Sequence, residues 1–202
     1  MKTKRKIGVV TALLIGFAIT THAQDPAQPT SPVNNAPRNN REFKLSVGPE
    51  FGLPISDFSN SYSWIFGGSV QADIPVANNL YVVANVGYND AFVKSNSGDE
   101  FQGRNLQLIP AKAGLKYFVF SDLIYIQATA GVGILGNHTD VGASKTSSFI
   151  YSPQVGVQIR LAPGNYIDAG FYFQQYTSNF WNSGNSGTLN TLGLRLAYSF
   201  GL

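Results

Sequence analysis

The residues of this chain that could perform chemistry are few. His138 is followed by Asp140, Ser144 and Ser147 in one polar segment. A histidine beside a carboxylate and a hydroxyl can form a nucleophilic triad, but a triad needs a geometry that proximity in sequence does not supply. Exposed loops carry the same residue types, so we predict no catalytic residue here.

Candidate ligands for a metal or cofactor are equally sparse. The chain has no cysteine and two histidines, and no glycine-rich phosphate loop follows a strand and opens a helix. Asp99, Glu100 and Asp140 could hold Ca²⁺ loosely at the surface, but two or three acids are more often solvated loop charges. We therefore expect neither a metal site nor a bound cofactor.

Eight segments of alternating apolar and polar residues fill the chain from residue 43 onward. They predict strands at residues 43–52, 64–74, 80–92, 106–119, 123–136, 148–161, 166–177 and 189–200. Links two, four and six are brief, whereas links one, three, five and seven run roughly ten residues each. This pattern is typical of a transmembrane barrel. We predict an all-β fold, an eight-stranded antiparallel transmembrane β-barrel with an N-terminal disordered tether.

The segment before the strands divides into two parts. Residues 1–23 have a basic start, a short apolar stretch and a small-residue cleavage site, which predict a signal peptide. Residues 24–42 are rich in proline, asparagine and glutamine and predict a disordered periplasmic tether. From residue 24 the chain keeps 10 Lys/Arg against 11 Asp/Glu, a net charge of −1. The remaining domain, residues 43–202, is therefore not basic, and we expect no nucleic-acid partner.

The two faces of each predicted strand differ in chemistry. One parity is apolar from end to end, as in Ile124, Ile126, Val132 and Ile134. The other parity is polar and collects nine glycines, which would relieve crowding beside large inward residues such as Tyr125 and Tyr172. A soluble barrel reverses this arrangement. The sequence predicts a lipid-facing exterior and a polar, filled interior.

Charged residues share the inward parity, and six of them fall in the lower half of the lumen. They are Lys44, Asp73, Lys116, Arg160, Asp168 and Arg195. Four cations and two acids in a narrow space must pair. We predict a lumen plug of salt bridges in which each aspartate contacts at least one of these cations, closing the pore.

Three prolines conflict with a barrel that has no free edge, because proline lacks an N–H group. They are Pro49, Pro110 and Pro153. Near Pro110 the apolar parity also changes, since Leu106 and Leu108 share one face while Ile109 and Ala111 share the other. A β-bulge at residues 109–110 would explain both observations.

The last strand carries a more specific pattern. Thr191, a glycine two residues later and then alternating apolar residues resemble the β-signal of outer-membrane barrels, although the chain ends Gly201-Leu202 and not on an aromatic residue. The resemblance implies that this strand is recognised by the barrel assembly machinery, with periplasmic chaperones as earlier partners. The assembly-signal residues would be Gly193, Leu196, Tyr198 and Phe200.

Residues 43–202 as a whole resemble the small eight-stranded outer-membrane β-barrel proteins of the OmpA/OmpX type. This resemblance implies the cell outer membrane of a Gram-negative bacterium, contact with outer-membrane lipid and lipopolysaccharide, and a monomer. That superfold hosts several functions. We expect a non-enzymatic structural or surface-contact role through the extracellular loops. A narrow channel or small-ligand conduit is the first alternative, and a lipid-modifying enzyme the second.

One further pattern bears on the enzyme alternative. Residues 176–179 loosely resemble the His-x-Ser-Asn motif of lipid A deacylases. Tyr176 occupies the position of the catalytic histidine, and a tyrosine cannot act as a base near neutral pH.

Overall fold

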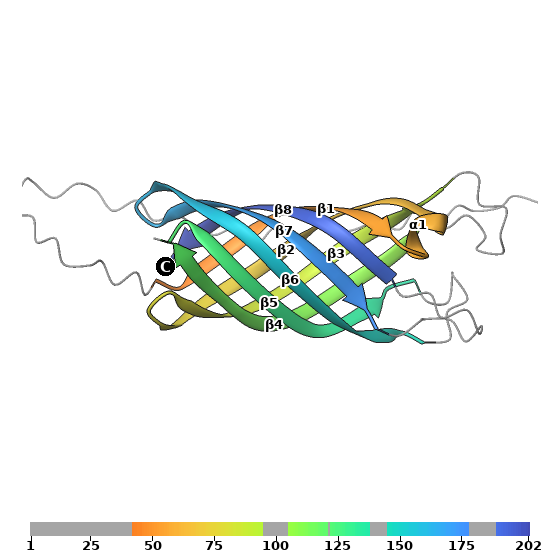
Figure 1. Cartoon of the computed structure of the whole chain (residues 1–202), viewed down its shortest axis with the longest axis horizontal. Helices are drawn as coiled ribbons and strands as arrows, with labels where there is room; N and C mark the ends of the chain where they lie inside the picture. Colours follow the sequence, from red (N-terminus) through yellow and green to blue (C-terminus); the bar gives the residue numbers. More distant parts are fainter. Residues whose placement is uncertain (1–41, 95–104, 121, 138–144, 178–188) are drawn as a thin grey trace, which may run out of the picture. The chain divides into compact units, whose positions relative to one another are not determined.

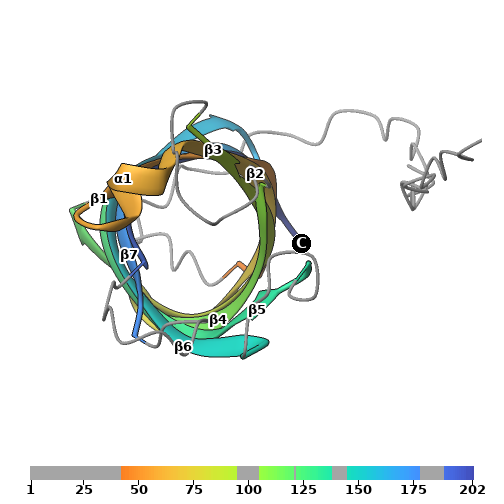
Figure 2. The same ribbon diagram turned by 90° about the vertical axis from the view of Figure 1, so that its right-hand side faces the viewer.

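Eight antiparallel strands close into a single barrel in the computed structural model, which describes residues 42–94, 105–120, 122–137, 145–177 and 189–202 (Figures 1 and 2). The strands are β1 (Lys44–Ile55), β2 (Tyr62–Ala77), β3 (Leu80–Val93), β4 (Leu106–Phe120), β5 (Ile124–Leu135), β6 (Ser147–Ala162), β7 (Asn165–Tyr176) and β8 (Leu189–Gly201). Each strand pairs with its neighbours in sequence, and β8 pairs with β1. The predicted eight-stranded antiparallel barrel and all eight predicted strands are confirmed.

Short links gather at one end of the barrel, which we call the turn end. Each contains a residue with left-handed backbone: Asn79 (φ 62°), Asp122 (φ 59°) and Gly164 (φ 76°). These are the residue types that tolerate this conformation best, so the chain can reverse within two or three residues.

The opposite end, which we call the loop end, carries the other links. The first of them is shorter than predicted, because β1 and β2 both extend and a single helical turn, α1 (Phe58–Ser61), joins them. No helix among the residues described is long and apolar enough to cross a membrane. The predicted signal peptide at residues 1–23, and all but the last residue of the predicted tether at 24–42, lie outside the described residues.

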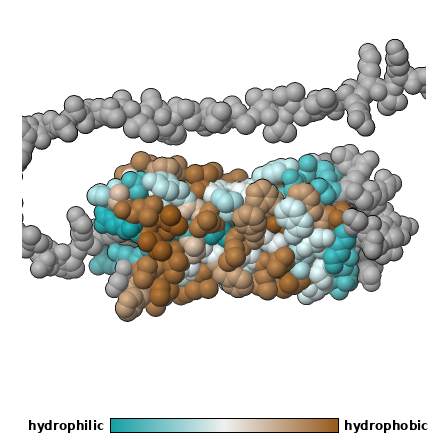
Figure 3. Space-filling view, turned by 90° about the horizontal axis from the view of Figure 1, so that it is seen from above, coloured by the Kyte–Doolittle hydropathy of each residue, from teal (hydrophilic) through white to brown (hydrophobic). Residues whose placement is uncertain are grey.

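Apolar side chains cover the wall of the barrel, as the alternation predicted. Large apolar residues on all eight strands are about half-exposed, among them Val47, Ile126 and Leu194. Figure 3 shows hydrophobic residues over much of the wall and hydrophilic ones toward its ends. Lys44, Lys116 and other inward residues of opposite parity are buried. This distribution suits a wall in contact with hydrocarbon.

The prolines are accommodated by gaps in the ladder and not by a bulge. The β3–β4 register is the same on both sides of Pro110, so the bulge predicted at residues 109–110 is wrong within β4, which is described throughout. Each of the three prolines keeps its pairing with one neighbouring strand and interrupts the ladder on the other side by two residue pairs. In an antiparallel sheet the backbone of one residue forms hydrogen bonds with only one of its two neighbouring strands. A proline therefore interrupts the ladder locally on one side of its strand and leaves the other side intact.

The parity of β4 is also constant as far as Phe118. Even-numbered residues point inward from Leu106 to Phe118, and Leu106 and Leu108 are therefore buried inside the barrel. The apparent parity change reflects an apolar segment of the lumen, and not a change in strand geometry.

Glycines on the inward parity make room for large neighbours, as predicted for Tyr125 and Tyr172. A Cβ atom at Gly156 would overlap the ring of Tyr125 and lie 2.6 Å from the carbonyl oxygen of Ala169. At Gly193 it would overlap the ring of Tyr172. The filled interior therefore depends on the absence of these side chains.

We predict that Gly156→Ala lowers the stability of the barrel by about 1–3 kcal/mol, because the added methyl group overpacks the lumen. Gly68→Ala is the matched control, since the nearest atom to its new Cβ would be 3.3 Å away. Urea unfolding of both variants in detergent micelles measures the difference. Equal unfolding midpoints for the two would contradict the packing argument.

Candidate functional site

Lys116 lies at the centre of the polar lumen and holds two carboxylates. Its Nζ is 3.0 Å from Asp73 Oδ2 and 2.7 Å from Asp168 Oδ2, and its side chain is completely buried. The three residues come from β4, β2 and β7, so the contacts cross the interior and do not follow the ladder. Gln71 Nε2 donates to the other oxygen of Asp73 at 2.8 Å.

Asp168 has partners from four different strands in this network. Besides Lys116 it accepts hydrogen bonds from Tyr125 Oη at 2.7 Å and from Gln158 Nε2 at 3.2 Å. Arg195 Nη1 lies 3.6 Å from its second oxygen. Both predicted aspartates thus contact predicted cations, and the neutral donors complete the coordination that a buried carboxylate needs.

Arg195 extends the network to the first two strands. Its Nη2 donates to Ser46 Oγ at 2.9 Å, and its Nε donates to Ser69 Oγ at 3.0 Å. Nε also lies 3.8 Å from Glu50 Oε1. Glu50 has the inward parity but is not one of the six residues of the predicted plug.

Lys44 joins the site through an amide and aromatic rings. Its Nζ donates to Gln158 Oε1 at 2.8 Å and lies 4.3 Å from the ring centre of Tyr166. The rings of Tyr81 and Phe118 are each 5.3 Å away. Aromatic faces attract cations, so the ammonium group is held at an aromatic floor near the turn end.

Arg160 does not belong to the plug, and its inclusion in the prediction was wrong. It is exposed, its Nε donates to the Ala162 carbonyl, and its guanidinium carbon lies 5.8 Å from the ring centre of Tyr166. Arg160 is near the end of β6, where a long side chain reaches past the rim to water. Inward parity predicts that a residue is buried only when the residue lies far enough from the rim of the barrel.

An apolar cluster fills the lumen at the loop end, which sequence reasoning missed. It joins Phe58 of α1 to side chains from seven of the eight strands, namely Tyr62, Ile65, Ala91, Leu106, Leu108, Leu135, Ile150, Tyr176 and Leu189. The ring centres of Phe58 and Tyr62 are 4.8 Å apart. Figure 2 shows α1 at this rim of the barrel. The prediction of a polar interior was therefore wrong at this end of the barrel.

The other candidates from the sequence form no site among the described residues. His138, Asp140, Ser144, Asp99 and Glu100 lie outside that part of the chain, and Ser147 begins β6 at the surface. Tyr176 is 1% exposed within the apolar cluster. In the parts of the chain that are described, no three side chains gather as metal ligands.

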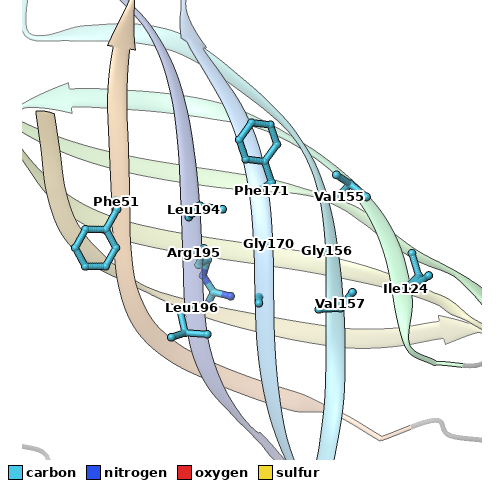
Figure 4. Close-up of a pocket in the computed structure, with 11 residues that line it drawn as sticks. Phe51, Ile124, Val155, Gly156, Val157, Gly170, Phe171, Leu194, Arg195 and Leu196 are labelled. Atoms are coloured by element: carbon cyan, nitrogen blue, oxygen red, sulfur yellow. The ribbon is translucent and has the colours of Figure 1, made fainter.

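A depression of about 610 Å³ lies on the outer wall over β5 to β8 and β1 (Figure 4). Outward residues such as Val155, Phe171 and Leu194 border it, beside Gly156 and Gly170. Its surface is almost entirely apolar, and the Arg195 side chain that lies behind it is buried in the lumen. The depression offers packing for hydrocarbon but no reactive group.

The predicted assembly-signal residues all lie on β8. Leu196, Tyr198 and Phe200 point outward and are 52%, 39% and 42% exposed, while Gly193 points inward. The rings of Tyr198 and Phe200 are 4.7 Å apart. Recognition of this strand by an assembly machine stays a prediction.

Comparison with known proteins identifies the fold. No protein-family model and no curated protein matches the chain. The solid-state NMR structure of outer membrane protein AlkL is similar, with a TM-score of 0.51 and 17% identity over 87% of this chain and 97% of that one. Neisserial surface protein A has a TM-score of 0.50 and 16% identity over 79% and 96%. Ail of Yersinia pestis has a TM-score of 0.49 and 15% identity over 79% and 98%.

The fold is thus that of the small eight-stranded outer-membrane barrels, as the resemblance implied. At such low identity the likeness concerns the fold alone.

We predict that Lys116→Met lowers the free energy of unfolding by about 3–5 kcal/mol, because it leaves two buried carboxylates without their closest cation. Lys116→Met with Asp73→Asn should recover much of this loss, since Asp168 keeps Arg195. Arg160→Met is the control and should change stability by less than about 0.5 kcal/mol, as expected of an exposed site. Urea unfolding in micelles measures all three. A larger loss for Arg160→Met than for Lys116→Met would contradict the assignment.

Proposed function

We propose that the protein is a non-enzymatic barrel of the bacterial outer membrane with a closed lumen, which serves a structural or surface-contact role. The observation that carries the proposal is the filled interior. An aromatic floor, an ion-paired layer and an apolar cluster follow one another from the turn end to the loop end. With the lumen occupied by the barrel's own side chains, contact with partners falls to the long links at the loop end.

The ion-paired layer supports a closed lumen because its contacts span the interior. Lys116 connects β4 to β2 and β7, and Arg195 connects β8 to β1, β2 and β7. An ion moving through the barrel would have to separate buried charges that are already paired, which is costly. The apolar cluster above this layer forms a second barrier, since it offers an ion no polar partner.

The outer wall supports an outer-membrane location and contact with lipid and lipopolysaccharide. An exposed row of aromatic rings runs across β1, β2 and β3 toward the loop end. Phe51 and Phe66 are 5.0 Å apart, and Trp64 stacks on Phe92 at 4.2 Å. Aromatic rings of this kind gather at membrane interfaces. The turn end would face the periplasm and the loop end the cell exterior.

The expected result for the lumen is an absence of stable single-channel currents when the purified barrel is reconstituted in planar bilayers. Lys116→Met with Asp73→Asn should also remain silent, because the apolar cluster still fills the loop end. A reconstituted porin provides the positive control.

Two outcomes would replace the proposal with an alternative. Reproducible unitary currents from the unaltered chain would favour the narrow channel. A change in lipid A mass that appears only when the protein is expressed would favour the lipid-modifying enzyme.

Assembly provides a separate expectation, with the barrel assembly machinery and periplasmic chaperones as the proposed partners and a monomer as the product. Tyr198→Ala with Phe200→Ala should leave the protein in the periplasm, because the last strand would lose its outward aromatic pair. Each truncation also removes apolar area worth roughly 2–3 kcal/mol when fully buried in lipid. Fractionation of the cell envelope measures the distribution.

Phe51→Ala with Phe66→Ala is the matched control. It removes a contacting aromatic pair of similar exposure from strands outside the proposed signal. Equal loss from the outer membrane for both double variants would show that aromatic area, and not the last strand, determines assembly.

A further inference from the structure

Closing the barrel requires β8 to pair with β1 in one particular register. β1 and β8 are neighbours in the barrel but lie at opposite ends of the chain, so no turn fixes their register. In a hairpin the turn fixes the register of the two strands. Twelve residues separate β7 from β8, so the preceding link does not restrict the position of β8 closely either.

The apolar row of β8 does not choose between registers that differ by two residues. A slip of one residue would turn its apolar side chains into the lumen, but a slip of two preserves their direction. The outward residues of β8 are Leu192, Leu194, Leu196, Tyr198 and Phe200. Those of β1 are also apolar at successive positions from Leu45 to Leu53. Lipid contact would be nearly the same after a two-residue slip.

The ladder between these strands is interrupted as well. In the observed register Glu50 lies opposite Arg195 and Val47 opposite Tyr198, with no backbone pairing at the two positions between them, where Pro49 lies. The backbone alone therefore specifies this seam less strongly than it does an uninterrupted pair of strands.

We infer that Arg195 is the residue that selects the closing register of the barrel. It is the charged residue of β8, and its guanidinium reaches both strands at the start of the chain. Nη2 donates to Ser46 Oγ at 2.9 Å, and Nε lies 3.8 Å from Glu50 Oε1 on β1. Nε also donates to Ser69 Oγ on β2 at 3.0 Å. Arg195 is 2% exposed, so water does not replace these partners.

Three registers are compared: the observed one and the two that differ from it by two residues. The inward residues of β1 provide polar partners for Arg195 only in the observed register. In the observed register Arg195 lies opposite Glu50 and also bonds to Ser46. A two-residue slip in one direction would replace these two partners with Gly48 and Lys44. A slip in the other direction would replace them with Gly52 and Gly48. One alternative brings two cations together, and the other separates Arg195 from Glu50 and places only glycines of β1 beside the guanidinium.

Asp168 keeps the guanidinium in position during this selection. It lies on β7, which pairs with β8 along its whole length, and its Oδ1 is 3.6 Å from Arg195 Nη1. A hairpin of β7 and β8 can therefore present Arg195 before β1 arrives. The inference concerns barrel closure and does not depend on the proposed location or surface role.

Cysteine pairs across the seam test this inference, and the chain contains no cysteine of its own. Positions 51 and 194 are directly opposite and exposed on the outer wall, so Phe51→Cys with Leu194→Cys reports the observed register. Phe51→Cys with Leu192→Cys or with Leu196→Cys reports the two slipped registers. Diagonal neighbours are about 7–8 Å apart, beyond the usual reach of a disulfide, so the pairs discriminate.

The measurement is the ratio of observed to slipped cross-links after refolding into detergent micelles under mild oxidation, scored on the total protein. With Arg195 present the ratio should exceed about tenfold, because the slipped registers separate buried charges from their partners. Arg195→Met should reduce the ratio by at least about tenfold. Lys116→Met is the matched control. It removes a buried cation with two shorter ion pairs, neither of which involves β1 or β8, and should preserve the ratio.

Each other result would overturn the inference. An unchanged ratio in Arg195→Met would show that the register is set elsewhere. An equal loss of preference in Arg195→Met and Lys116→Met would show that general stability, and not Arg195, selects the register. Glu50→Gln with Ser46→Ala removes the partners on β1 and should reproduce the effect of Arg195→Met. A retained preference in that variant would also contradict the inference.

Discussion

The interior of a closed ring of eight strands is only as wide as the side chains that point into it. Inward residues from strands on opposite sides of the ring therefore meet, as Lys116 of β4 meets Asp73 of β2 and Asp168 of β7. Outside the wall a hydrocarbon layer would offer no hydrogen bond, so the polar groups of the interior depend on one another for partners. These two conditions together explain why the charges pair, why glutamines and Tyr125 surround them, and why glycines face the largest rings.

The same constraint explains the order of layers along the lumen. Charged groups lie in the middle, with Lys44 among aromatic rings at the turn end and an apolar cluster with α1 at the loop end. Burying these charges at both ends strengthens their mutual attraction but removes water that would otherwise stabilise them. Such a layer persists only when each charge has several partners, as Asp168 has in Lys116, Tyr125 and Gln158.

Sequence patterns predicted the wall of this protein better than its interior. The alternation of apolar and polar residues in strands such as β5 depends only on which side of the strand faces lipid. This alternation predicted the number of strands and which side chains point outward. The interior depends on which residues meet across the ring, which is set by strand tilt and stagger, and these leave no local pattern. Glu50 was therefore not assigned to the network. If every apolar residue faces outward, Leu106 and Leu108 indicate a change in parity, and the structure does not contain that change.

Arg160 and the prolines show a second limit of the sequence reasoning. Parity correctly gave the direction of Arg160 but not its distance from the rim, and that distance determines whether a charge is buried or solvated. For Pro110 the missing N–H was assumed to need a bulge. The barrel instead leaves two residue pairs open on one side of the strand, because the other side carries the pairing that proline can still make.

The two faces of each strand thus serve different physical purposes. The outward row needs only to be apolar, so many sequences and several registers satisfy it. The inward row contains particular charges at particular heights, and it is satisfied by one arrangement. A barrel in a membrane gains little specificity from hydrophobic contact, since lipid is as apolar as its own wall. Buried ion pairs add little net stability when compared with apolar packing. Arg195, with its partners on β1, β2 and β7, is best understood as the means by which this chain distinguishes its closed register from those that differ by two residues.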